Sequence, residues 1–259
     1  MRNPLFYYFC NENMKRTTKL GIAGCVAAAV AALVFFARPI YKALSPKPVE
    51  EGDLTEFPVR GIDISSHNGS VDFDRAAALG IRFVIMKASE GSDFKDAAFI
   101  DNIRRAREAG LKVGVYHFFR FDADGRMQAL NLLHSVRGRR LDMPLVIDLE
   151  EWGNPQVATS AVVSRLETML AALDDAGMSV MLYTNKDGYQ RFIREHFKTY
   201  PLWICSFSDP PLGQADDDAW QLWQYSHRGW VSACGTPVDL NTFNGSRQQW
   251  EQWLRSSTF

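Results

Sequence analysis

From Val59 onward, the sequence alternates short apolar runs with segments of helical pattern, and this alternation restricts the fold more than any other feature. The apolar runs at residues 81–87 and 112–119 have the length of buried strands. Gly80 and Gly110 end the helical segments that precede these two runs. Strands that alternate with helices predict a parallel sheet with helices packed against it.

The pattern predicts an α/β fold, an irregular TIM-like (β/α) barrel of about five strand-and-helix units and three further strands. A doubly wound open sheet is the alternative, and it is weaker because no Gly-rich phosphate loop follows the first strand. Strands are expected at residues 59–64, 81–87, 112–119, 143–152, 179–184, 202–207, 219–225 and 237–240. Helices are expected at residues 72–79, 96–109, 123–139, 157–176, 187–197 and 248–254.

The fourth apolar run ends in two carboxylates, Asp148 and Glu150. Alternate residues of a strand share a face, so both side chains should point the same way, with Cα atoms roughly 7 Å apart. In barrel enzymes the chemistry lies at the carboxyl ends of the strands, where this pair would stand. The alternative is a strand whose last residues merely reach water.

Further acidic residues follow other expected strands, namely Asp63, Glu90 and Asp239. A single carboxylate of this kind is explained as readily by a helix cap or a salt bridge. Acids at several strand ends would converge on one opening if the barrel prediction holds. Aromatic residues are interleaved with them at Tyr116, Tyr183, Trp203 and Trp223.

The ordered set of motifs resembles glycoside hydrolase family 25, the Chalaropsis-type muramidases, over about residues 58–255. The motifs that carry the resemblance are Gly61-Ile62-Asp63-Ile64-Ser65, Met86-Lys87-Ala88-Ser89-Glu90-Gly91, Gly114-Val115-Tyr116-His117-Phe118, Asp148-Leu149-Glu150, Tyr183-Thr184-Asn185, Trp203, Trp223-Gln224-Tyr225 and Val238-Asp239-Leu240-Asn241. The resemblance implies an irregular eight-stranded barrel that cleaves the β-1,4 bond between N-acetylmuramic acid and N-acetylglucosamine in peptidoglycan strands.

By that resemblance, Glu150 would be the general acid that protonates the leaving oxygen. Crowding by Asp148 and burial in an aromatic cleft would raise the pKa of Glu150. Asp148 would be the ionised partner, which either attacks the anomeric carbon or orients the 2-acetamido group of the substrate. The position of both acids on one strand leaves these two mechanisms open.

The remaining site residues also follow from the resemblance. Asp63 and Asp239 look like the flanking acids of the catalytic group. For Trp203 core packing is the alternative, and Glu90 could instead bind backbone groups. The expected substrate contacts are Glu90, Tyr116, Tyr183, Trp203, Trp223, Gln224 and Asn241.

The N-terminal part differs from the rest of the chain. Residues 20–37 carry no charge and approach the length of a membrane-spanning helix, so we expect an anchor there. Residues 1–19 would be cytoplasmic, 38–57 a tether, and 58–259 a monomeric catalytic domain outside the cytoplasm, in the periplasm or cell envelope. A cleaved signal peptide, which would release the protein, is the main alternative, and Met14 is a second candidate start.

Other chemistries leave no comparable trace in the sequence. A formal net charge of -1 argues against nucleic-acid binding. The histidines lack metal-ligand spacing, so no metal and no cofactor are expected. Cys205 and Cys234 could form a disulfide in an oxidising compartment. Two rival functions remain, a non-catalytic wall-binding module of the same fold and a glycosidase that acts on chitin-like polymers.

Overall fold

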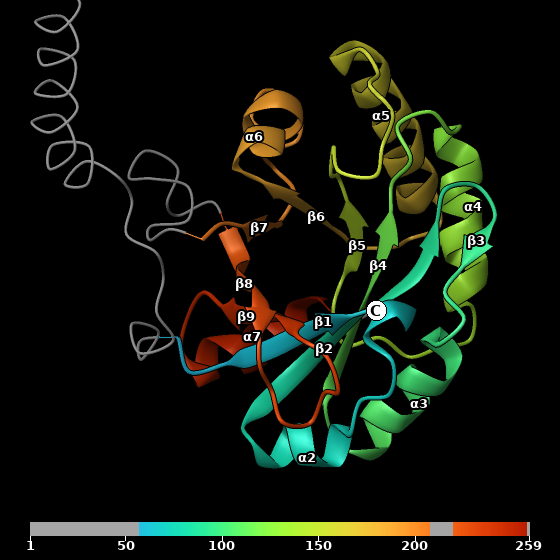
Figure 1. The fold of residues 1–259 in the computed structure, drawn as a ribbon. Coiled ribbons are helices and arrows are strands. Elements are labelled where there is room, and N and C mark those ends of the chain that lie inside the picture. Colours follow the sequence, from blue (N-terminus) through green and yellow to red (C-terminus); the bar gives the residue numbers. More distant parts are fainter. Residues whose placement is uncertain (1–56, 208–219, 258–259) are drawn as a thin grey trace, which may run out of the picture. The chain divides into compact units, whose positions relative to one another are not determined.

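The strands of the computed structural model close into a barrel (Figure 1). The structure describes residues 57–207 and 220–257, and the statements below concern these residues. The sheet order is β1-β9-β8-β7-β6-β5-β4-β2-β3, and a direct pairing of β1 with β2 closes eight of these strands into a ring. Strand β9 runs antiparallel to both of its neighbours, and the other strands of the ring are parallel. The alternative of an open doubly wound sheet is therefore wrong.

The strands lie close to the predicted positions, with differences at their ends. Strand β2 continues beyond the predicted residues 81–87 because its last residues still pair with β4 and with the short strand β3. The strands are β1 (Arg60–Ile64), β2 (Ile81–Glu90), β3 (Phe94–Lys95), β4 (Lys112–Phe118), β5 (Leu145–Asp148), β6 (Val180–Asn185), β7 (Leu202–Cys205), β8 (Trp220–Gly229) and β9 (Val238–Phe243).

Helices α2 to α5 lie around the outside of the barrel (Figure 1). Side-chain caps begin two of them, since Asp72 accepts a hydrogen bond from the Arg75 N–H and Asp124 accepts one from the Met127 N–H. The predicted helix at residues 187–197 is wrong, because a short helix and a π-helical turn over Tyr189–Ile193 replace it. The helices are α2 (Phe73–Ala78), α3 (Phe99–Glu108), α4 (Gly125–Val136), α5 (Thr159–Asp175), α6 (Lys186–Gly188) and α7 (Arg247–Ser257).

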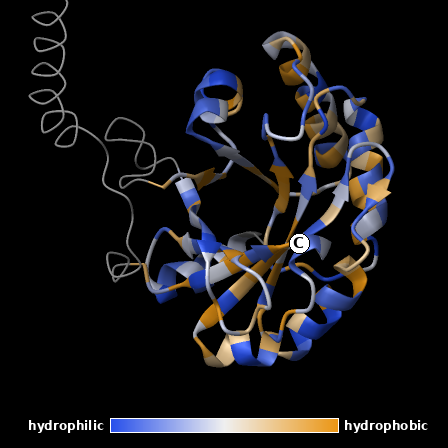
Figure 2. Ribbon diagram, in the orientation of Figure 1, coloured by the Kyte–Doolittle hydropathy of each residue, from blue (hydrophilic) through white to orange (hydrophobic). Residues whose placement is uncertain are grey.

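The strands divide the core into two layers, because successive side chains point to opposite faces. Residues such as Ile62 and Val84 point outward and pack with the helices, whereas Phe83 and Val146 fill the barrel. Trp250 of α7 belongs to the inner cluster. In Figure 2 the central strands carry hydrophobic stretches, and helices α2 to α5 mix hydrophobic with hydrophilic residues.

Gly61 is one residue that the barrel interior requires. A Cβ added to Gly61 would lie 2.3 Å from the ring of Phe83, which is completely buried. Only glycine lets this ring pack against β1, two residues before Asp63 on the same face of the strand. The aromatic ring thus fills the space beneath the acidic residues.

Two further expectations concern the cysteines and the N-terminal segment. The disulfide that the sequence left open is not formed: Cys205 ends β7, Cys234 lies in a loop, and both are free thiols. The predicted cytoplasmic segment, the anchor at residues 20–37 and nearly all of the tether lie outside the described residues. Within residues 57–207 and 220–257, no helix combines the length and the apolar character that crossing a membrane requires.

Candidate active site

A cavity of about 860 Å³ opens at the carboxyl ends of the parallel strands. This volume is within the range of sites that bind small molecules. All but two of the predicted site residues line the cavity. Those that line it are Asp63, Glu90, Tyr116, Asp148, Glu150, Tyr183, Trp203, Gln224 and Asp239.

Strand pairing explains why acids from distant parts of the chain meet there. Asp148 is the last residue of β5, and Glu150 follows two residues later. Antiparallel pairing of β1 with β9 places Asp63 directly opposite Asp239. Strand β9 runs antiparallel to its neighbours, so the start of β9 lies at the same opening as the ends of β1 and β5. Asp239, near the start of β9, therefore reaches this opening.

Asp63 is held by two amide groups and is almost fully buried. Its Oδ2 accepts hydrogen bonds from Nε2 of Gln224 at 2.9 Å and from Nδ2 of Asn241 at 2.7 Å. Burial, followed by the charge of Asp239, raises the pKa of Asp63 well above its usual range, against the effect of these amides. Burial also raises the pKa of Asp239, to about 6.

Glu150 contacts the hydroxyl of Tyr183, which lies 3.1 Å from Glu150 Oε1 and 2.8 Å from Gln224 Oε1. Burial raises the pKa of Glu150, a hydrogen bond from Tyr183 lowers it, and the charge of Asp63 raises it further. A hydroxyl has one proton to donate, and Gln224 is the nearer acceptor. The contact with the Tyr183 hydroxyl orients the Glu150 carboxyl at the cavity, and burial favours its protonated form, which a general acid requires.

Asp148 is the most deeply enclosed of the predicted catalytic pair. Burial, followed by the charges of Glu150 and Asp63, raises the pKa of Asp148 well above its usual range, while Lys87 opposes this shift. Its Oδ1 is buried and has no hydrogen-bond partner among the described residues. Burial therefore favours a proton on both acids, and the role of Asp148 as the ionised partner of Glu150 stays a prediction.

The family model described as "Glycosyl hydrolases family 25" matches residues 62–234. The matched region includes Asp63, Asp148 and Glu150 and ends before Asp239. This chain belongs to glycosyl hydrolase family 25. It is therefore a glycoside hydrolase, as the resemblance of its motifs implied.

Individual relatives agree with the family model. The uncharacterized protein YegX of Escherichia coli K12 is 31% identical over 206 residues, which cover 76% of this chain and 74% of YegX. An autolytic lysozyme of Clostridium acetobutylicum is 31% identical, over 72% of this chain and 56% of the lysozyme. The solved structure of a family 25 glycosyl hydrolase from Bacillus anthracis has a TM-score of 0.70 and 29% identity, covering 81% of this chain and 98% of that structure.

Two predicted substrate contacts of this family 25 chain do not line the cavity. Trp223 is completely buried on the outward face of β8, where its Nε1 donates to the Ser206 carbonyl. Its neighbour Gln224 points inward because side chains alternate along the strand. Asn241 is also completely buried, and it accepts a hydrogen bond from Trp203 Nε1 at 2.9 Å while holding Asp63. Asn241 therefore positions site residues, and Trp223 belongs to the core.

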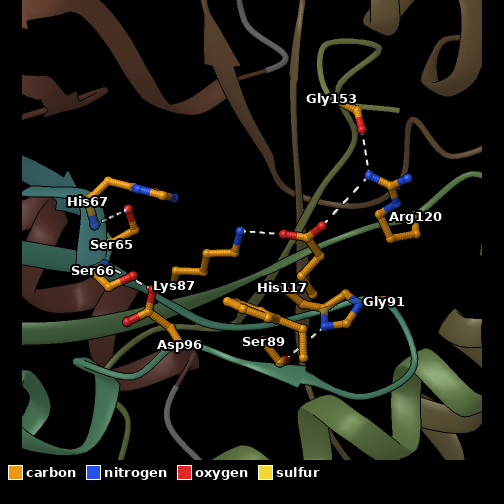
Figure 3. Close-up of polar contacts among 12 residues, drawn as sticks. Ser65, Ser66, His67, Lys87, Ser89, Gly91, Asp96, His117, Arg120 and Gly153 are labelled. Carbon is orange, nitrogen blue, oxygen red and sulfur yellow. Dashed lines mark hydrogen bonds and ion pairs between the residues drawn. The ribbon is translucent and has the colours of Figure 1, made fainter. Parts of the chain in front are cut away.

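On the β2 and β4 side of the opening, Glu90 lies between two cations, Lys87 and Arg120, both of which are labelled in Figure 3. Lys87 donates to its Oε2 at 2.6 Å, and a guanidinium nitrogen of Arg120 lies 3.7 Å from its Oε1. Arg120 also donates to the carbonyl of Gly153, in the turn that follows Glu150. Glu90 therefore lines the cavity and links β2 to this turn through two side chains, whereas the alternative left open for it was binding to backbone groups.

Lys87, Arg120 and Trp152 are among the cavity-lining residues that the sequence did not point to. Lys87 is inward-facing on β2, which strand alternation with Phe83 could have indicated. Trp152 follows the acidic pair closely in the sequence, but exposure of a tryptophan cannot be read from its neighbours. Within the residues that the structure describes, no group of three His, Cys, Asp or Glu side chains is arranged to hold a metal ion.

Proposed function

We propose that this glycosidase is a peptidoglycan muramidase that hydrolyses the β-1,4 bond between N-acetylmuramic acid and N-acetylglucosamine. The main support is the grouping of Asp63, Asp148, Glu150 and Asp239 in one cavity of a family 25 barrel. The Clostridium relative is named a lysozyme, and one from Arthroderma benhamiae is named an N,O-diacetylmuramidase.

Glu150 acts as the general acid in this proposal. Burial favours the protonated form of its carboxyl, and the contact with Tyr183 orients the group at the cavity. Proton donation to the departing glycosidic oxygen then avoids the release of an alkoxide. Asp63 and Asp239 flank the pair, and the cavity-lining aromatics Tyr116, Tyr183 and Trp203, together with Glu90 and Gln224, contact the sugar.

Asp148 is the partner carboxyl, either as nucleophile or as the group that orients the substrate's 2-acetamido group. A nucleophile must be ionised, whereas a carboxyl oxygen can accept an N–H in either protonation state. The raised pKa of Asp148 and its unpartnered Oδ1, judged among the described residues, favour the orienting role. The N–H of a 2-acetamido group would supply the donor that this buried oxygen lacks.

The decisive experiment incubates the purified chain and its Glu150→Gln variant with peptidoglycan and identifies the new reducing ends. We expect the wild type to release N-acetylmuramic acid ends and the variant to lose activity by about 10²–10⁴-fold. Glu167→Gln, which changes an exposed carboxylate on α5, is the matched control and should retain activity.

Equal activity of wild type and Glu150→Gln would end the catalytic assignment. Binding to peptidoglycan without new reducing ends would support a wall-binding module instead. Cleavage of chitin-like polymers alone would support the alternative of a glycosidase that acts on those polymers. The substrate lies outside the cytoplasm, so we place the catalytic domain there and propose that residues 20–37 anchor it to the membrane.

A further inference from the structure

Trp152 is the most exposed large hydrophobic residue in the described part of the chain, at 83%. It lines the active-site cavity, two residues beyond Glu150. Because it is both exposed and part of the cavity wall, the Trp152 indole is accessible to a ligand bound there. Trp230 is also exposed, at 68%, but it does not line the cavity.

The turn that carries Trp152 is held from both sides. Asn154 Nδ2 donates to the carbonyls of Glu150 at 2.8 Å and Phe119 at 3.0 Å, and its Oδ1 accepts from the Phe121 N–H at 2.8 Å. The Trp152 indole is therefore displayed on backbone whose geometry is fixed by the loop after β4.

The two residues that flank Trp152 are held as well. Gly153 has a φ of +79°, a left-handed conformation suited to glycine, and its carbonyl accepts from Arg120 (Figure 3). Glu151 forms an ion pair with Arg191. A fixed turn loses little conformational freedom on binding, so its exposed indole is pre-organised for a ligand.

We propose that Trp152 is the stacking platform for the sugar ring on the leaving-group side of the scissile bond, a β-linked N-acetylhexosamine. Pyranose rings present a flat array of C–H groups, which an exposed indole face can cover with apolar contact. The general acid must lie next to the leaving oxygen, and Trp152 follows Glu150 on the same turn. This inference rests on the proposed function of Glu150.

The test compares two substrates of the full chain. Polymeric peptidoglycan has a sugar on the leaving-group side, whereas the β-fluoride of the N-acetylglucosaminyl–N-acetylmuramic acid disaccharide has only a fluorine atom in its place. We expect Trp152→Ala to lower kcat/KM for the polymer by about tenfold and to change that for the glycosyl fluoride by less than about twofold. Trp152→Phe should retain most of the polymer activity, because it keeps an aromatic face.

Trp230→Ala is the matched control, since it removes an exposed tryptophan outside the cavity and should leave both activities unchanged. Unchanged polymer activity of Trp152→Ala would overturn the proposal. An equal loss on both substrates would also overturn it, because the contact would then not be specific to the leaving sugar. Failure of the muramidase proposal itself is distinguishable, since the wild type would then release no N-acetylmuramic acid ends.

Discussion

At the scale of single residues, the site gathers carboxyls that the folded chain does not favour in their charged form. Burial raises the pKa values of Asp63, Asp148, Glu150 and Asp239, so ionisation of each costs stability. Functional sites commonly show such perturbed groups because the chemistry needs them. The acids are therefore expected to lower the stability of the free protein at neutral pH.

Asp239 offers a test of this cost. Its pKa is about 6 in the folded protein and 3.8 as the ordinary value, so the cost is fully present above pH 6 and disappears as the pH falls below 3.8. Asp239→Asn should raise the Tm by roughly 6–12 °C at pH 7, and most of this gain should be lost at pH 4. Thermal melts of both proteins at the two pH values measure it.

Asp175→Asn, on the exposed end of α5, controls for the general loss of a negative charge. The Tm of Asp175→Asn should differ little from that of the wild type at both pH values. If Asp239→Asn melts below the wild type at pH 7, or if its gain persists unchanged at pH 4, burial of the Asp239 charge is not the cause.

At the scale of elements, β2, β4 and α4 are joined by buried polar side chains behind the active site. Ser89 Oγ lies 2.8 Å from His117 Nδ1, and His117 Nε2 lies 3.2 Å from Gln128 Oε1. Gln128 also accepts from the Arg120 N–H at 2.8 Å and donates to the Arg120 carbonyl at 3.0 Å. This side chain of α4 therefore fixes the backbone of Arg120, which holds the Trp152 turn.

Gln128→Leu would leave several buried groups of Arg120 and His117 without partners. We expect it to lower the free energy of unfolding by about 2–4 kcal/mol, measured by urea denaturation. Because the Arg120 backbone would lose its anchor, activity on the polymer should fall more than the folded fraction alone explains. Gln248→Leu, at an exposed position of α7, is the control and should change neither the free energy of unfolding nor the activity appreciably. If Gln248→Leu loses as much stability as Gln128→Leu, the buried network is not responsible for the loss.

The elements also show how far sequence reasoning reaches. The apolar runs predicted the strands because burial on both faces requires them, and the acids at the ends of β1 and β5 followed. Trp223 and Gln224 were both assigned to the sugar site, although alternation allows only one of two neighbours to point inward. Which one does so depends on the register between β7 and β8, where the pairing shifts, and no local pattern specifies that register.

At the scale of the whole molecule, closure of the barrel is what brings the acids together. Asp63 and Asp239 come from opposite ends of the domain sequence and face each other only because β9 inserts antiparallel between β1 and β8. The predicted count of eight strands favoured a barrel, but no local pattern in the residues of β9 specifies that it runs antiparallel to its neighbours. Exposure of Trp152 depends likewise on contacts from β4 and α4 that are remote in sequence.

The proposed anchor is tested on the full chain in its own cells. An uncharged segment at residues 20–37 of about this length partitions into a hydrocarbon core, so the full chain should sediment with membranes and remain there after a high-salt wash. Deletion of residues 20–37 should move it to the soluble fraction. Substitution of Val30 and Leu33 by Lys should have the same effect, because charges near the centre of the span oppose insertion. Recovery of the wild-type chain only in the soluble fraction would contradict the anchor.

Protease added outside the cytoplasmic membrane should digest the catalytic domain. A catalytic domain that is protected from this protease would contradict its placement beside the peptidoglycan.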